Sequence, residues 1–151
     1  MQTACIVLCK DGRRVENIGK CMNEIVYSSD IKTFDATKLN GFFVGWKHPL
    51  TPDEHYKLLK SSSHFVVATD SKTGNIVGFI TAVSDGVLSA FIPLLEVLPA
   101  YQKLGIGKSL TEKMLNKLKD IKNIDLICDE CMQAFYKQFK MHKAHGMIIR
   151  K

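Results

Sequence analysis

The chain has 151 residues with a formal net charge of +6, and 46% of its residues are hydrophobic. This length fits one domain with its own core, so we treat residues 1–151 as a single domain. No apolar run approaches the roughly 20 residues that span a bilayer, and the five cysteines show no framework spacing. We therefore expect a cytoplasmic protein with reduced thiols and no membrane partner. The lysines are scattered, which favours a solvated basic surface over the clustered patch that nucleic acid requires.

The first third of the chain predicts short elements around an aromatic loop. Thr3–Leu8 has the composition of a strand, and Glu24–Tyr27 predicts a second one. Asp35 is a suitable N-cap for a helix that reaches about Phe42. The segment GFFVGWKHPL, residues 41–50, follows as an aromatic loop. Thr51, Pro52 and Glu54 then form a capping-box start for a helix that ends near Lys60.

The hydrophobic period changes to two in the middle of the chain. Three strands linked by tight turns are predicted at His64–Thr69, Ile76–Val83 and Val87–Leu98. Pro93 lies inside the third strand, and proline cannot donate a ladder hydrogen bond. We therefore expect a bulge or a splayed edge at Pro93.

The last third alternates helices and strands. An amphipathic helix follows the glycines at 105 and 107, with a buried face at Leu110, Met114, Leu118 and Ile121. A strand at Ile124–Cys128, a short helix around Phe135 and a final strand at Met147–Ile149 are predicted after it. The order favours an α/β (α+β) fold with a mixed, largely antiparallel central sheet flanked by helices.

Residues 101–110, YQKLGIGKSL, contain two phosphate-binding patterns that fail on spacing. A P-loop requires glycine five residues before its Gly-Lys-Ser, and Gln102 stands at that position. A dinucleotide fingerprint requires a small third residue, where Leu110 stands, and a βαβ unit. Both interpretations are therefore rejected.

A zinc site is also rejected. Cys128-x2-Cys131 is followed by His142-x2-His145, but the histidines are closer together than the usual three to five intervening residues. Buried thiols at the end of a strand and the start of a helix are commonly structural. A redox role is equally disfavoured, because Asp129 and Glu130 lie between the cysteines and oppose a thiolate.

The pattern that fits is Gln102-x-x-Gly105-x-Gly107, placed after a strand and before an amphipathic helix. Such a loop presents consecutive backbone N–H groups at a helix N-terminus, which is an anion site. Glycines let the backbone approach a pyrophosphate closely. Lys103 and Lys108 add positive charge.

This arrangement resembles the coenzyme A loop of the GNAT superfamily of acyl-CoA N-acyltransferases. The resemblance covers roughly residues 24–150 and includes LLEVLPAYQKLGIG and AFYKQFKM, the latter similar to the family's Phe-Tyr helix. It implies a GNAT fold with splayed central strands, with residues 1–20 as an atypical extension. The chain departs from the family at Lys140-Met141, where glycine is usual before the final aromatic residue, and at Asp129, where asparagine is frequent.

The resemblance implies a set of roles for binding acetyl-CoA as a cosubstrate, without metal. Backbone groups of Leu95, Glu96 and Val97 would hold the pantetheine amides. The loop from Gln102 to Ser109 would hold the pyrophosphate, through the residues Gln102, Lys103, Leu104, Gly105, Ile106, Gly107, Lys108 and Ser109. Phe135 and Tyr136 would lie beside the thioester, with Lys137 near the nucleotide end.

The implied reaction is N-acetyl transfer to an amine in a ternary complex. Glu96 is the first candidate for the base, with Asp85, Glu130, His145 or a water chain as alternatives. Tyr136 would hydrogen-bond the leaving thiolate. Aromatic residues of the loop and the following helix would either line an acceptor pocket or belong to the core; they are Phe42, Phe43, Trp46 and Tyr56.

Two functions therefore stay open. The favoured one is an acetyltransferase acting on a small-molecule amine or a peptide amine, as a monomer or a homodimer. The alternative is a regulatory or interaction module that binds CoA and has lost catalysis. The sequence leaves the acceptor unidentified.

Overall fold

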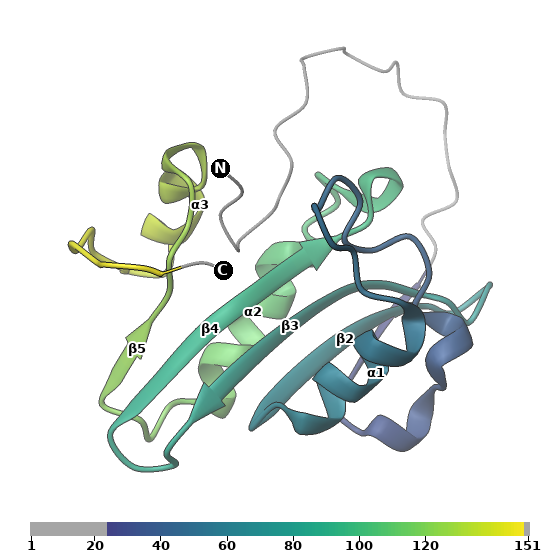
Figure 1. Cartoon of the computed structure of the whole chain (residues 1–151), viewed down its shortest axis with the longest axis horizontal. Coiled ribbons are helices and arrows are strands. Elements are labelled where there is room, and N and C mark those ends of the chain that lie inside the picture. The colour runs from purple at the N-terminus through teal and green to yellow at the C-terminus, as the bar shows by residue number, and fades with distance from the viewer. Residues whose placement is uncertain (1–23, 150–151) are drawn as a thin grey trace.

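The computed structural model describes residues 24–149. Within this part the chain forms a five-stranded sheet in the order β1-β2-β3-β4-β5, in which every neighbouring pair is antiparallel except β4 and β5, which are parallel. Figure 1 shows the sheet with helix α1 on one face and helix α2 on the other. The strands are β1 (Ile25–Ser28), β2 (His64–Asp70), β3 (Ile76–Ser84), β4 (Ser89–Val97) and β5 (Asn123–Asp125). The α-helices are α1 (Pro52–Ser61), α2 (Ile106–Lys117) and α3 (Gln133–Lys137), and short 3-10 turns lie at Ile31–Thr33, Ala36–Lys38, Pro99–Tyr101 and Glu130–Met132.

Local sequence signals account for most of these elements. The Thr51 hydroxyl accepts the Glu54 amide and the Glu54 carboxylate accepts the Thr51 amide, so the predicted capping box begins α1. The three hairpin-linked strands are confirmed as β2, β3 and β4, with ends within two residues of the prediction. The mixed, largely antiparallel fold class is confirmed as well.

Strand β4 contains the predicted bulge at Pro93. Thr81 on β3 pairs with Leu94 and Val83 pairs with Phe91, so Ile92 and Pro93 together oppose the single residue between Thr81 and Val83. The alternation of buried side chains changes phase at this point. Ala90 and Ile92 face the α2 side before the bulge, whereas Leu95 and Val97 face that side after it.

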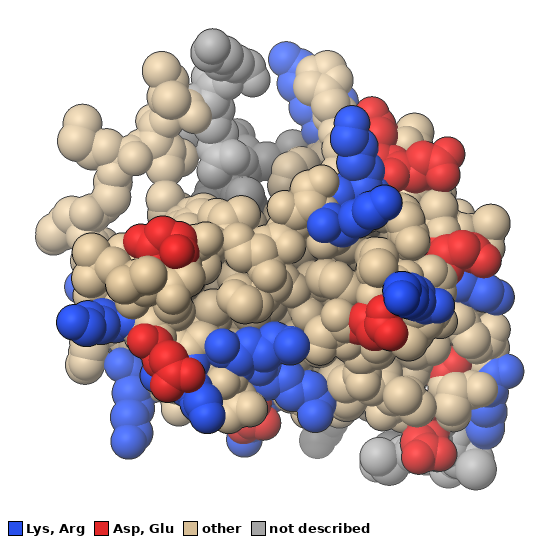
Figure 2. All heavy atoms as spheres, turned by 90° about the horizontal axis from the view of Figure 1, so that it is seen from below, with Lys and Arg blue, Asp and Glu red and all other residues tan. Residues whose placement is uncertain are grey.

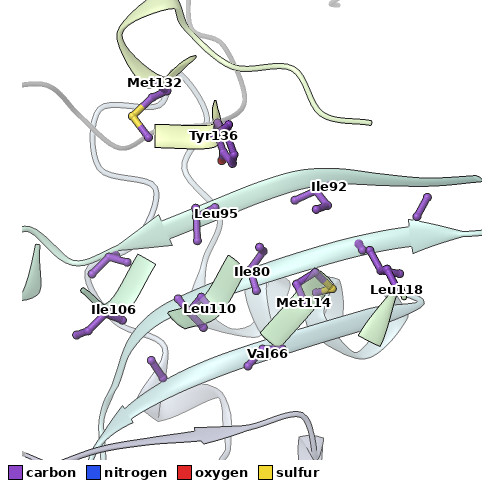
Figure 3. Close-up of a cluster of buried hydrophobic side chains, with 14 of the residues drawn as sticks. Val66, Ile80, Ile92, Leu95, Ile106, Leu110, Met114, Leu118, Met132 and Tyr136 are labelled. Carbon is purple, nitrogen blue, oxygen red and sulfur yellow. The ribbon is translucent and has the colours of Figure 1, made fainter. Parts of the chain in front are cut away.

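The sheet separates two hydrophobic clusters. The cluster on the α2 side joins three strands of the sheet, α2 and α3, and Figure 3 shows its core residues Val66, Ile80, Ile92, Leu95, Leu110 and Met114. The cluster on the α1 side is rich in aromatic residues from the aromatic loop and the sheet, and its buried members are Leu39, Phe42, Phe43, Leu59, Val67, Ile76 and Phe79. The sheet is therefore covered on both faces, and its remaining opening lies at the β4–β5 edge.

Three predicted elements differ from the structure. Asp35 caps only the 3-10 turn Ala36–Lys38, because the backbone leaves the helical region at Leu39, with φ −102° and ψ 47°, and is left-handed at Gly41, with φ 85°. The strand predicted at Ile124–Cys128 has the wrong bounds, because β5 ends at Asp125. Asp125 pairs with Phe91 of β4, and Phe91 lies two residues before Pro93, which interrupts that strand.

The predicted strand at Met147–Ile149 is wrong. Residues 141–149 contain no regular secondary structure, and Met147 and Ile149 are 100% and 89% exposed. The apolar composition of this segment favours a strand only if a neighbouring strand pairs with it. The strand predicted at Thr3–Leu8 lies outside the described residues.

Over residues 24–149 the structure contains no helix long and apolar enough to cross a membrane. Figure 2 shows one face of the molecule, on which lysines and acidic residues are interspersed. The charges visible there do not gather into a single-sign field. The absence of a nucleic-acid partner stays a prediction.

Gly78 on β3 marks the closest approach of α2 to the sheet. A Cβ atom at Gly78 would lie 3.2 Å from Leu110 Cδ1, 3.2 Å from Val97 Cγ2 and 3.3 Å from the Glu96 carbonyl oxygen. We expect Gly78→Ala to lower the free energy of unfolding by about 1–3 kcal/mol, because overpacking a core displaces its neighbours. Urea unfolding measures this change, and Ser71→Ala in the exposed turn before β3 is the control. Equal midpoints for both variants would show that α2 adjusts freely over the sheet.

Candidate active site at the β4–β5 opening

The site begins where β5 leaves β4. The two strands pair only from Ser89 to Phe91, opposite Asn123 to Asp125. Beyond Phe91, β4 continues to Val97 with β3 on one edge and no described strand on the other. Backbone groups on this outer edge are thus available to a ligand, as expected for splayed central strands.

The residues predicted to hold pantetheine lie along this edge. The side chains of Leu95 and Val97 are buried in the α2-side cluster, so only their backbone groups face the opening. The Val97 carbonyl already accepts a hydrogen bond of 2.9 Å from the Gln102 side-chain amide. Gln102 therefore fixes the end of β4 against the loop that follows.

The glycine loop, residues 102–107, ends in the first turn of α2. Gly105 is the N-cap with φ 80°, and Lys103 also adopts a left-handed conformation with φ 63°. Gly105 has no side chain to cap the helix. The first-turn amides of Ile106, Gly107 and Lys108 consequently point out of the helix, which is the arrangement that binds an anion. These residues fit a pyrophosphate.

The charged and polar side chains of this loop contribute less directly to the anion site than its backbone amides do. Lys108 Nζ lies 3.8 Å from Glu112 Oε1, and both side chains are more than half exposed, so this surface pair contributes little to stability. Leu104 is 63% exposed at the tip of the loop. The Ser109 amide donates to the Gly105 carbonyl, so Ser109 is already part of the helix.

An anchor missed by the sequence interpretation holds the start of the loop. The Tyr101 hydroxyl donates a hydrogen bond of 2.7 Å to the Asp70 carboxylate at the end of β2. Asp70 is fully buried and also accepts the Lys72 amide. Because the two residues are 31 positions apart, no local pattern could have indicated this contact.

Helix α3 brings the second predicted motif to the loop. Phe135 Cζ lies 3.8 Å from the position that a Gly107 Cβ would occupy, and Val97 Cγ2 lies at the same distance. Tyr136 is 3% exposed and packs in the α2-side cluster. Figure 3 shows Tyr136 beside β4, close to Leu95. The structure therefore places Phe135 and Tyr136 next to the strand and loop assigned to the cofactor.

Glu96 lies on the other face of β4. Its carboxylate accepts the Phe43 backbone amide, with 3.0 Å from the nitrogen to Oε1 and 3.3 Å to Oε2. Burial raises the pKa of Glu96 to about 7, and the Phe43 hydrogen bond opposes this shift only in part. A carboxyl group with such a pKa can exchange a proton near neutrality.

The alternative bases are less well placed. Asp85 lies in the turn before β4, at the opposite end of the strand from Glu96. It accepts the amides of Val87, Leu88 and Ser89, and these hydrogen bonds hold its pKa below the ordinary value. Glu130 is exposed in the turn before α3. His145 lines a pocket of about 780 Å³, bounded by β5, α3 and residues 141–148, that Tyr136 also lines and Glu96 does not.

The aromatic residues proposed for the acceptor pocket divide into two groups. Phe42 and Phe43 are 6% and 1% exposed and belong to the core beneath the sheet, so they do not line an open pocket. Trp46 and Tyr56 are partly buried at the margin of the same cluster. The backbone amide of Phe43, which no side-chain pattern reveals, is the group that reaches Glu96.

Within residues 24–149 no group of three or more histidine, cysteine or acidic side chains could hold a metal ion. Cys128 is a partly buried free thiol, and Cys131 is exposed. Burial, with a smaller contribution from Asp129, raises the pKa of the Cys128 thiol, which disfavours a reactive thiolate.

Comparison with known proteins identifies the family. The model of the acetyltransferase (GNAT) family matches residues 31–141. The chain therefore belongs to the GNAT acetyltransferases, as the two motifs indicated. A candidate acetyltransferase from Deinococcus radiodurans R1 is 35% identical, with a TM-score of 0.81, over 84% of this chain and 88% of that one.

Two further proteins are similar to the chain, one in sequence and one in fold. The histone acetyltransferase TAP1 of Glycine max is 31% identical over 77% of this chain, which spans about half (55%) of that protein. The structure of AAC(6')-Iy with the bisubstrate analogue CoA-S-monomethyl-acetylneamine has a TM-score of 0.59 and covers 85% of this chain and 97% of its own. At 12% identity this likeness shows the fold alone.

The loop geometry makes a prediction about CoA binding. A branched side chain at Gly105 would oppose its left-handed backbone and displace the first-turn amides. We expect Gly105→Val to raise the dissociation constant for CoA at least tenfold, measured by isothermal titration calorimetry. Lys108→Ala, three residues along and already paired with Glu112, should raise it no more than a few-fold. A larger effect of Lys108→Ala would contradict binding through the backbone amides.

Proposed function

We propose that this chain transfers an acetyl group from acetyl-CoA to an amine by direct attack within a ternary complex, without a metal ion. One observation carries the proposal. Glu96 and Tyr136 lie on opposite faces of the sheet beside the opening between β4 and β5, and the glycine loop follows the end of β4. A thioester in this opening would have a base on one side and a hydroxyl donor on the other.

The cofactor would bind along β4 and across the start of α2. The outer edge of β4 near Leu95 and Glu96 would hydrogen-bond the pantetheine amides. First-turn amides after Gly105 would hold the pyrophosphate, supported by the loop residues from Gln102 to Ser109. Phe135 would pack beside the pantetheine, since its Cζ lies 3.8 Å from the position that a Cβ of Gly107 would occupy.

Glu96 would act as the base toward the acceptor. An alkylamine has a pKa near 10.4, so its deprotonation at neutral pH costs roughly 4–5 kcal/mol. A carboxylate with a pKa of about 7 is a better match for this proton than an ordinary glutamate. Glu96 also faces the aromatic loop, where an acceptor would approach from the α1 side.

Tyr136 would stabilise the departing sulfur. A thiol has a pKa near 8.5 and tyrosine near 10, so complete proton transfer from the hydroxyl is slightly uphill. A hydrogen bond to the developing thiolate is the more reasonable role. Burial of Tyr136 excludes water and strengthens such a bond.

The acceptor would be a small-molecule amine or a peptide amine. A peptide amine is supported by the similarity to TAP1 of Glycine max, which is described as a histone acetyltransferase. A chain that binds CoA tightly but acetylates no amine or peptide would instead be a regulatory module. The location in a cytoplasm and the monomeric or homodimeric state are further predictions.

The role of Glu96 predicts a pH dependence. Its raised pKa keeps the carboxyl group protonated below about 7, so the fraction competent as a base grows as pH rises through that value. We expect kcat, measured from the rate of thiol release, to increase with pH up to about 7 and then to level off. Glu96→Gln should lower kcat by about 10²–10⁴-fold and abolish this rise of kcat with pH. If kcat of that variant still rose with pH in the same way, the base would be another group.

The role of Tyr136 predicts a separation of catalysis from binding. We expect Tyr136→Phe to lower kcat at least tenfold, because the ring still fills the cluster while the hydroxyl is lost. The dissociation constant for acetyl-CoA should stay within a factor of three. Tyr101→Phe, which removes the partly buried hydrogen bond to Asp70, is the control for loss of a tyrosine hydroxyl and should lower stability more than kcat. Wild-type turnover of Tyr136→Phe would end the assignment.

A further inference from the structure

The cavity of about 780 Å³ beside the β4–β5 opening is large enough for a small ligand. It is bounded by β5, α3 and the segment after α3, which lie together at one side of the sheet (Figure 1). Tyr136 lines it from α3. Phe91 lines it from the face of the sheet that carries Glu96, because its neighbours Ala90 and Ile92 face α2. The cavity is therefore open to both faces of the sheet at the opening.

The wall of the cavity combines an apolar surface with positive charge. Ile124, Phe139 and Met141 line it and pack against the α2-side cluster. Its charged side chains are four lysines and one carboxylate, Asp125, together with two histidines. The whole chain, in contrast, has 21 Lys and Arg and 15 Asp and Glu. A cleft lined by one sign of charge concentrates ions of the other sign, so this cavity attracts anions. The four lysines are Lys122, Lys137, Lys140 and Lys143.

The cavity lies at the end of α2 and β4 that is distant from the glycine loop. Leu115 lines it from α2, ten residues after Gly105, which corresponds to about 15 Å along a helix. Phe91 lines it six residues before Val97, which corresponds to roughly 20 Å along a strand. No residue of the glycine loop is among its lining residues. A cofactor that starts at this loop and follows β4 therefore reaches Tyr136 and the cavity with its thioester end.

A simple amine is a poor match for this cavity. An alkylamine has a pKa near 10.4, so it is a cation at neutral pH. Four lysines repel that cation unless the same molecule carries an anionic group that lies among them. The apolar part of the wall contacts an aromatic or aliphatic body between the two charges.

We infer that this cavity holds the acceptor of the acetyl transfer, and that the acceptor is an amine with a carboxylate or phosphate group on an apolar body. The inference rests on the proposed function, because it specifies the acceptor of that reaction. The anionic group lies at Lys140 and Lys143, and the amine lies at the opening beside Tyr136. The same lysines disfavour a polycationic peptide as the acceptor.

The alternative occupant is a phosphate of the cofactor. The family resemblance places Lys137 near the nucleotide end of coenzyme A, and Lys137 lines this cavity. The position of the cavity favours the acceptor. In coenzyme A the nucleotide and the pantetheine extend from opposite ends of the pyrophosphate, so a pantetheine that follows β4 directs the nucleotide away from the cavity.

The acceptor class is tested with two compounds that differ in the charge of the group opposite the amine, 4-(aminomethyl)benzoate and 4-(aminomethyl)benzamide. Isothermal titration calorimetry measures their binding to the full chain saturated with CoA, which carries no acetyl group to transfer. We expect the benzoate to bind at least about tenfold more tightly, and its affinity to fall between about 50 and 500 mM salt, because salt screens exposed charges. 4-(Aminomethyl)phenylphosphonate decides between the two anions, since the natural group should resemble the one that binds more tightly.

The double variant Lys140→Gln with Lys143→Gln tests the lysines. It should reduce the preference for the benzoate to about threefold or less, and leave the affinity for CoA within a factor of about two. Lys57→Gln with Lys60→Gln is the matched control, because it removes the same charge from two exposed lysines of α1 that do not line the cavity. This control should keep the full preference.

The inference is overturned if the two compounds bind equally or not at all, if the cavity variant keeps the preference, or if the α1 control loses it. It is also overturned if CoA abolishes benzoate binding, or if the cavity variant weakens CoA but not dephospho-CoA, because the cavity then holds a phosphate of the cofactor. Binding is measured without acetyl transfer. An anion preference without thiol release from acetyl-CoA would therefore contradict the proposed function and leave an anion-binding cavity, whereas equally efficient release with both compounds would contradict only this inference.

Discussion

The extra residue in β4 is the constraint on which the site depends. Before the bulge, even-numbered residues of β4 face α2; after it, odd-numbered residues do. Without this change of phase Glu96 would point into the apolar cluster around Leu110 and Met114, where an ionised carboxylate has no partner. Leu95 would point toward the aromatic loop instead. One residue therefore decides which face of the sheet carries a titratable group.

The same part of β4 explains the opening beside it. Pro93 has no N–H group for a ladder, and the pairing with β5 ends at Phe91, two residues earlier. The strand remains rigid beyond that point because β3 continues to pair with it as far as Val97. An ordered strand edge without a neighbouring strand is a place where an extended ligand can supply the missing hydrogen bonds.

The sequence predicts the elements whose signals are local. The capping box at Thr51, the hairpins between β2 and β4, and the glycines before α2 each depend on residues within a few positions of one another. The bulge at Pro93 was predicted for the same reason, since a missing N–H acts where it occurs. The prediction of a strand at Met147–Ile149 was wrong, because a strand requires a pairing partner and composition does not reveal one.

Several parts of the site could not be predicted from sequence. The contact between the Phe43 amide and Glu96 uses a backbone group, which is present at almost every position and so carries no pattern. The Tyr101–Asp70 hydrogen bond joins residues from separate elements. The burial that raises the pKa of Glu96 arises from the packing of the aromatic loop against the sheet. Side-chain identity marked Glu96 as a candidate, and its environment emerged only in the folded chain.

The tight contact at Gly78 has a consequence for how this protein can diverge. Gly78, Leu110 and Val97 share one small volume between the sheet and α2. A related chain with a larger residue at position 78 would need a smaller one at position 110 or 97 to keep α2 at the same height above the sheet. The height of α2 above the sheet also fixes where its first turn lies beside β4. Substitutions at the three positions should therefore covary among related chains. Chains that lack the compensation should carry the glycine loop in a shifted position.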